Sequence, residues 1–89
     1  MRFKYRKSMK LPKRRQERIY CLCQSIEYLS PEKYAAVKAA CDKTGYGDAV
    51  FEYITTDASS VYVSQKYYIS EKWLAVKTAE VFRMLANIL

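Results

Sequence analysis

The 89-residue chain contains no histidine, and this absence removes the commonest routes to catalysis. Without histidine, no Ser-His or Cys-His pair can activate a nucleophile. The sequence also has no glycine-rich phosphate loop and no paired-carboxylate motif. A structural zinc site lacks its usual ligand set, because only Cys21, Cys23 and Cys41 are available. We therefore predict a protein that is not an enzyme and that holds no cofactor and no metal ion.

The chain is also poor in glycine and proline, with two residues of each. So few turn-forming residues, together with 51% apolar residues, favour helices with short connections over a β-rich fold. No run approaches the ~20 apolar residues of a membrane span, and no apolar segment with a cleavage site follows the basic start. Three cysteines are an odd number for a disulfide framework. We predict one small domain, reduced and cytoplasmic, without a membrane partner.

Positive charge is concentrated at one end of the chain. The formal net charge is +7, and the first fifteen residues hold eight cations and no anion, whereas the remainder balances eight cations against nine anions. This self-repelling composition predicts a basic flexible arm over residues 1–11, ahead of a single helical domain over residues 12–89. The arm would contact phosphates or enter a minor groove. A solubilising tail and attraction to anionic lipid are the two other interpretations.

Apolar spacing predicts helices throughout the domain. The first helix begins near Pro12 and carries one apolar stripe, formed by Ile19, Leu22, Cys23, Ile26 and Leu29. A second helix is expected over residues 30–43, ended by Gly45, and a third over residues 49–55. The last five residues of that third segment also suit a short strand by β-propensity. The predicted fold class is all-α, a compact bundle of about five helices.

Residues 59–83 have the pattern of a short helix, a tight turn and a longer helix. Thr56 or Asp57 would cap the short helix, and Leu74 is the first deeply apolar position of the long one. The Ser70 hydroxyl can accept a hydrogen bond from the free N–H groups that open the long helix, and Glu71 favours the same positive end. This order resembles the helix-turn-helix of bacterial regulators, including sigma-factor region 4 and small phage activators. The resemblance covers about a quarter of the chain.

The resemblance implies that the second helix enters the major groove of double-stranded DNA while the first braces it across the backbone. Lys72 would then reach a phosphate or a guanine edge, and Glu71 would accept from cytosine. Tyr68 occupies the turn position where such motifs often carry glycine. With its basic arm, the chain also looks like the small regulatory proteins of phages and mobile elements in Gram-positive bacteria.

We therefore predict a non-enzymatic DNA-binding regulator or accessory protein. Its candidate nucleic-acid-binding residues are Arg2, Lys4, Arg6, Lys7, Lys10, Lys13, Arg14, Arg15, Arg18, Gln65, Lys66, Ser70, Glu71, Lys72, Trp73 and Lys77. The alternative is a protein-interaction module, or an inhibitor of a nucleic-acid enzyme, that acts through the apolar last helix. That helix is apolar on more than one side, which also predicts a homodimer. A helical hairpin that only fills a core is the third interpretation of residues 59–83.

Overall fold

The computed structural model describes residues 1–88 and is helical throughout that range, which confirms the predicted all-α fold class. The segment that also suited a strand lies within a helix. The described elements are two short 3-10 turns, η1 (Lys7–Met9) and η2 (Ile26–Tyr28), and five α-helices, α1 (Lys13–Gln24), α2 (Pro31–Asp42), α3 (Gly47–Thr55), α4 (Ser60–Tyr67) and α5 (Glu71–Ile88).

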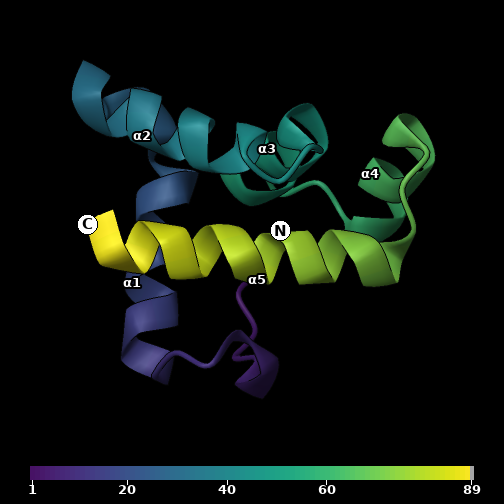
Figure 1. The fold of residues 1–89 in the computed structure, drawn as a ribbon, viewed down its shortest axis with the longest axis horizontal. Coiled ribbons are helices and arrows are strands. Elements are labelled where there is room, and N and C mark those ends of the chain that lie inside the picture. Colours follow the sequence, from purple (N-terminus) through teal and green to yellow (C-terminus); the bar gives the residue numbers. More distant parts are fainter. Residues whose placement is uncertain (89) are drawn as a thin grey trace.

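The last helix, α5, is the central element of the fold (Figure 1). Its 18 residues span about 27 Å at the usual helical rise, close to the 30 Å longest extent of the molecule. In Figure 1, α2 and α3 lie along one side of α5 and the N-terminal segment lies on the other, while α1 crosses behind the C-terminal part of α5. The short helix α4 packs at the first turn of α5. The core-facing side chains Leu74, Phe82 and Leu85 of α5 are fully buried. Most of the helix's apolar surface is therefore used inside its own chain.

Two of the predicted helix ends are set by the residues that the sequence indicated. The Ser30 hydroxyl accepts a hydrogen bond from the Lys33 N–H at 3.3 Å, and Pro31 opens α2. Gly45 follows α2 with φ +81°, a left-handed conformation that glycine adopts without the steric cost of a side chain. Local capping rules therefore placed α2 correctly.

The first helix is shorter than its apolar stripe predicted, because the chain tightens into η2 after Gln24. The Gln24 side-chain amide donates to the carbonyl oxygens of Ile54 at 2.9 Å and Thr56 at 3.1 Å. These bonds tie the end of α1 to the end of α3. The tighter turn still brings Ile26 into the core.

The first eleven residues lie against the domain, where the sequence predicted a flexible arm. Met1 and Met9 are buried, and Phe3 packs on Tyr20 with ring centroids 5.5 Å apart. The difference has a physical reason. The cations of the segment stand at solvent-exposed or half-buried positions, while Met1 and Met9 enter the core and Leu11 packs against it. Alternation of the two kinds of residue allows the segment to pack without burying its charges.

A single buried side chain, Gln16, holds this segment in place. Its Oε1 accepts from the Arg6 N–H at 3.0 Å, and its Nε2 donates to the carbonyl oxygens of Arg6 and Leu11, each at 2.9 Å. Gln16 is fully buried, so each of these backbone groups has an amide partner in place of water. The side chain acts as a clamp between α1 and residues 6–11.

Candidate nucleic-acid interface

The sharp turn predicted at residues 68–70 is present between α4 and α5 (Figure 1). Tyr68 adopts φ 55° and ψ 42°, the left-handed conformation expected for the position that often carries glycine. The Ile69 N–H donates to the Ser64 carbonyl at 3.1 Å, and Ile69 itself is buried. The Ser70 hydroxyl accepts from the Trp73 N–H at 3.0 Å and so caps α5 as predicted.

The start of α4 differs from the prediction that Thr56 or Asp57 would cap it. Ser59 is the cap, because its hydroxyl accepts from the Tyr62 N–H at 3.1 Å. The Thr56 hydroxyl instead donates to the Glu52 carbonyl at 2.7 Å, which makes it part of the end of α3. Thr56 and Ser59 both carry a hydroxyl shortly before α4, so the sequence alone did not show which of the two caps this helix.

The opening turns of α5 present a mixed polar and aromatic surface. Lys72 is exposed, Trp73 is 42% exposed and Val76 lies beside them, while Leu74 faces the core. The Lys77 ammonium sits 4.6 Å from the centroid of the Trp73 ring and 3.1 Å from a carboxylate oxygen of Glu80. Only 15% of the Lys77 side chain is exposed, so this lysine mainly packs against Trp73 and presents little of its charge to solvent.

On the bracing helix, Gln65 is exposed but the charge of Lys66 is already engaged. The Lys66 ammonium lies 2.8 Å from Glu52 Oε1, and the Tyr67 hydroxyl donates to the same oxygen at 2.8 Å. These hydrogen bonds hold the pKa of Glu52 below its usual value and raise the pKa of Lys66. Glu71 is likewise occupied, because its carboxylate accepts from the Ser60 hydroxyl at 2.8 Å.

The basic N-terminal segment, residues 1–11, runs beside this face of α5. Ser8 of η1 lines a hollow of about 240 Å³ together with Lys72, Ala75, Val76, Ala79 and Arg83. Arg83 Nη1 also donates to the Met9 carbonyl at 3.4 Å. The exposed cations Lys7, the first residue of η1, and Lys10, directly after it, are neighbours of Ser8 and therefore lie near the same face of α5 as Lys72.

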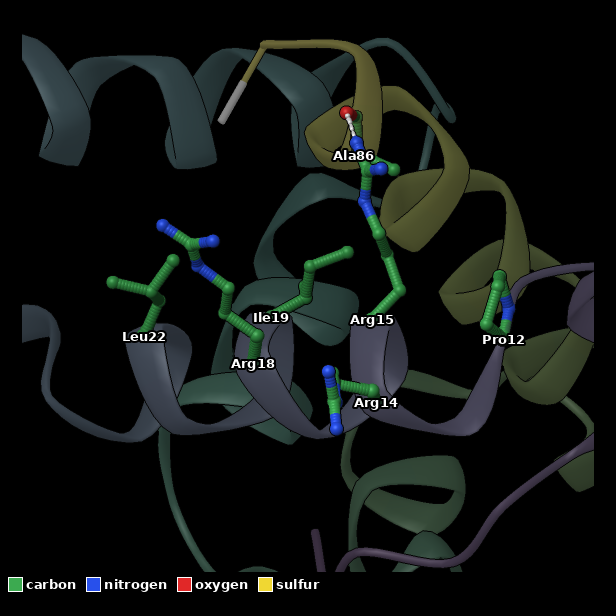
Figure 2. A pocket seen from close by; sticks show the side chains of 7 residues that line it. All are labelled: Pro12, Arg14, Arg15, Arg18, Ile19, Leu22 and Ala86. Atoms are coloured by element: carbon green, nitrogen blue, oxygen red, sulfur yellow. Dashed lines mark hydrogen bonds between the residues drawn. The ribbon is translucent and has the colours of Figure 1, made fainter.

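The arginines of α1 form a separate group at the other end of α5 (Figure 2). Arg15 Nη2 donates to the Ala86 carbonyl at 2.6 Å. Ala86 lies fourteen residues beyond Lys72, about 21 Å along the helix. Arg14 and Arg18 share a hollow with Arg15 and do not join the surface around Lys72. The structure thus divides the predicted cations into two groups rather than one band, and Lys13 pairs with Glu17 at 3.8 Å outside both.

Two further cations lie near the exposed face of α5 and were not predicted from the sequence. Lys43, at the end of α2, lines a hollow of about 390 Å³ that also includes Lys77, Glu80 and Arg83. Arg83 could have been found from its helical spacing, since it follows Lys72 and Val76 on one side of α5. Lys43 is distant in sequence from all of these residues, so no local pattern indicated it.

The three cysteines are free thiols, and only Cys21 is exposed. Burial raises the pKa of Cys23 and of Cys41 to about 12, so both thiols stay protonated and unreactive at neutral pH. Among residues 1–88, no three or more Cys, Asp or Glu side chains gather where they could hold a metal ion. Within that range, too, every helix is too short or too polar to cross a bilayer.

The fold and this site define an all-helical protein whose N-terminal segment and helix–turn–helix corner meet on one side. No family model, no curated protein and no solved structure matches the chain.

Proposed function

We propose that this protein binds double-stranded DNA as a non-enzymatic regulator or accessory protein, of the type found in phages and mobile elements and acting in the cytoplasm. The binding surface consists of the first turns of α5 and the basic N-terminal segment. One observation carries the proposal: Ser8 and Lys72 line the same hollow, so the cations around η1 lie beside the exposed start of α5. A helix flanked by cations is the arrangement that major-groove binding requires.

The side chains available at this surface favour affinity over base selection. Lys72, Lys7 and Lys10 are exposed cations that can neutralise phosphates on either side of a groove. Val76 can contact a thymine methyl group, whereas Glu71 is held by Ser60 and is less available for cytosine. Because the N-terminal segment is packed rather than free, its cations are already ordered before binding and lose less entropy. We expect strong salt dependence and modest sequence preference.

The structure bears on the alternative of a protein-interaction module that uses the apolar last helix. Leu74, Val81 and Phe82 of α5 are fully buried within the chain, so this face is not available to a partner. The exposed large apolar side chains that remain on the described part of α5 are Trp73, Val76 and, at its end, Ile88. A homodimer through α5 stays a prediction that rests on those three positions.

Two lysines in equivalent helical positions allow a matched test of the proposal. Lys72 lies in the first turn of α5 and Lys33 in the first turn of α2, each directly after a glutamate and each exposed. We expect Lys72→Ala to weaken binding to a labelled mixed-sequence duplex several-fold, and to reduce the slope of log K against log salt by about 0.9, because one phosphate contact is lost. Lys33→Ala should leave both quantities unchanged. Fluorescence anisotropy at several salt concentrations measures them.

A second set of variants tests the N-terminal segment. Replacing Arg2, Lys4 and Lys7 together by Ala should weaken all duplexes alike and flatten the salt dependence further. Circular dichroism confirms that each variant is folded. Equal losses from Lys72→Ala and Lys33→Ala would mean that the protein attracts DNA only as a polycation, and this result would overturn the proposal.

A further inference from the structure

The hollow beside the α1 arginines has an apolar floor under a cationic rim (Figure 2). Its volume is about 390 Å³. Figure 2 shows Arg15 and Arg18 rising from α1 on either side of Ile19, with Leu22 one turn further along. The rim consists of Arg14, Arg15 and Arg18, and the floor consists of Pro12, Ile19, Leu22 and Ala86.

A second hollow, of about 410 Å³, continues from the first. It shares Arg18 and Leu22 and adds Glu32, Lys33, Ala36 and Ile88. The two hollows together form one trough, here called the α1 groove, bounded by α1, the start of α2 and the end of α5. From Pro12 to Leu22 the groove follows α1 for about 15 Å, the length of roughly three helical turns.

The charges of the α1 groove are strongly unbalanced within residues 1–88. Its lining residues include the cations Arg14, Arg15, Arg18 and Lys33 and a single anion, Glu32. None of these cations makes an ion pair with another described residue, and Arg15 is held by the neutral Ala86 carbonyl. Ile88, which lines the second hollow, is 58% exposed and so adds accessible apolar surface to the groove.

The residue types in the floor of the α1 groove indicate which kind of ligand the groove can bind. A phosphate backbone binds to cations but makes no favourable contact with the apolar side chains of Ile19, Leu22 and Ile88. Unpaired bases stack on aromatic side chains, and none of the lining residues of this groove is aromatic. Apolar side chains flanked by carboxylates satisfy both parts of the groove, because aliphatic groups cover the floor and carboxylates accept from the guanidinium groups.

We infer that the α1 groove is a docking site for an acidic amphipathic helix of another protein. About three turns of such a helix match the length of the groove, with leucine-like side chains against the half-buried Leu22 and the exposed Ile88 and carboxylates against Arg14 and Arg18. The site lies about 21 Å along α5 from Lys72, so a peptide here and a duplex at the other end do not compete for one surface. The inference is independent of the DNA-binding proposal.

The probe is a set of three synthetic peptides of equal length. The first is an amphipathic helix with leucines on one face and glutamates beside them, the second replaces each glutamate by lysine, and the third scrambles the first so that the leucine face is lost. The acidic amphipathic peptide should bind at least tenfold more tightly than either control. In an NMR titration, its shift changes should gather at Ile19, Leu22, Ala86 and Ile88.

Variants of the groove separate this site from the DNA surface. Leu22→Ser and Arg18→Ala should each weaken the acidic peptide about five- to tenfold, whereas Lys4→Ala, a cation removed from the N-terminal segment, should leave it unchanged. Arg18 is exposed, so Arg18→Ala should fold normally. This variant still tests the groove if Leu22→Ser folds poorly. Leu22→Ser should also bind the duplex with unchanged affinity.

Two results would overturn the inference. Equal binding of the scrambled peptide would show that charge alone attracts it, without use of the apolar floor. A loss of duplex affinity in Arg18→Ala, with no loss of peptide affinity, would assign the groove to nucleic acid. A failure of the DNA proposal is distinguishable from both, because it appears as an unaffected duplex affinity in Lys72→Ala while peptide binding persists.

Discussion

The two ends of α5 carry cations in similar numbers but in different settings. At its start, Lys72 borders a hollow of about 240 Å³ that is also lined by Ser8 of η1 and by the small residues Ala75 and Ala79. At its end, Arg15 and Arg18 stand over the apolar floor of the α1 groove. Charge alone does not distinguish the two ends. The size of the hollow beneath the charges does, because the two hollows of the α1 groove, of about 390 and 410 Å³, have room for the apolar face of a peptide, whereas the hollow at the start of α5 measures about 240 Å³.

The largest expected effect comes from Gln16→Ala, which would release residues 6–11 of the N-terminal segment from α1. The change leaves the Arg6 N–H and the carbonyl oxygens of Arg6 and Leu11 without their amide partner. We expect a loss of about 2–4 kcal/mol in the free energy of unfolding, because buried backbone groups without partners cost about 1–3 kcal/mol each and some regain water. Urea denaturation measures the loss.

The matched control is Gln65→Ala, since Gln65 is exposed and lies on α4. Its stability should change by less than about 0.5 kcal/mol. Hydrogen exchange should also accelerate over residues 1–11 in Gln16→Ala alone. Unchanged protection there would mean that Met1 and Met9 hold the segment without the amide clamp, and the proposed preorganisation of its cations would no longer depend on Gln16.

A smaller effect, of opposite sign, is expected at the turn that opens α5. Tyr68 is 97% exposed and has a positive φ, so Tyr68→Gly removes backbone strain and loses almost no packing. The strain is worth about 1–2 kcal/mol and the extra freedom of glycine in the unfolded chain costs about 0.5–1 kcal/mol, which leaves a net stabilisation of about 0.5–1 kcal/mol. Thermal unfolding measures it.

Tyr28→Gly is the control, because Tyr28 is also strongly exposed but has no positive φ. That substitution should destabilise the protein by about 0.5–1 kcal/mol. Backbone strain is often found at functional positions, so the duplex affinity of Tyr68→Gly should be measured as well. If Tyr68→Gly stabilises the protein and weakens duplex binding, the side chain belongs to the DNA surface at the start of α5.

The smallest effect concerns the ion pair that withdraws Lys66 from this surface. Glu52→Gln frees the Lys66 charge, so duplex affinity at low salt should rise about two- to threefold. Stability at neutral pH should fall by less than about 1 kcal/mol, as for other partly exposed pairs. The control is Glu27→Gln, which removes the same charge at η2, away from the α4–α5 turn. An equal rise in affinity for both variants would assign the effect to net charge.

The pH dependence of the same pair has a defined sign. Lys66 and Tyr67 lower the pKa of Glu52 in the folded protein. The pair therefore contributes its stability above the ordinary glutamate pKa of 4.5, and this contribution is lost as the pH falls from there through the lowered pKa. The stabilities of wild type and Glu52→Gln should converge in that acidic range and differ at neutral pH.

Much of the fold could be predicted from the sequence because it depends on neighbours along the chain. The cap at Ser30, the end of α2 at Gly45 and the cap at Ser70 follow from backbone rules that act over a few residues. The sharp turn at residues 68–70 was predicted because two helical patterns meet there, although a tyrosine stands at the position where such motifs often carry glycine, and Tyr68 adopts the positive φ of that position. The length of α1 was overestimated, since a 3-10 turn can continue an apolar stripe.

The candidate site was less predictable because it depends on partners far apart in sequence. Nothing local indicates that Glu52 would reach Lys66, or that Gln16 would fix residues 6–11. Charge repulsion within the N-terminal segment predicted a flexible arm. In the structure, the burial of Met1 and Met9 contributes favourable hydrophobic free energy that opposes this repulsion. The two groups of cations likewise separate only once α1 is placed across the far end of α5.

The position of the N-terminal amine has a practical consequence for every assay proposed above. The Met1 ammonium donates to the carbonyl oxygens of both Thr56 and Ala58, in the connection between α3 and α4. A purification tag fused ahead of Met1 converts this ammonium into one amide N–H, which cannot serve both oxygens, and it places foreign sequence beside the connection between α3 and α4. Fluorophores therefore belong on the duplex or the peptide, and the polypeptide should be used without an N-terminal extension.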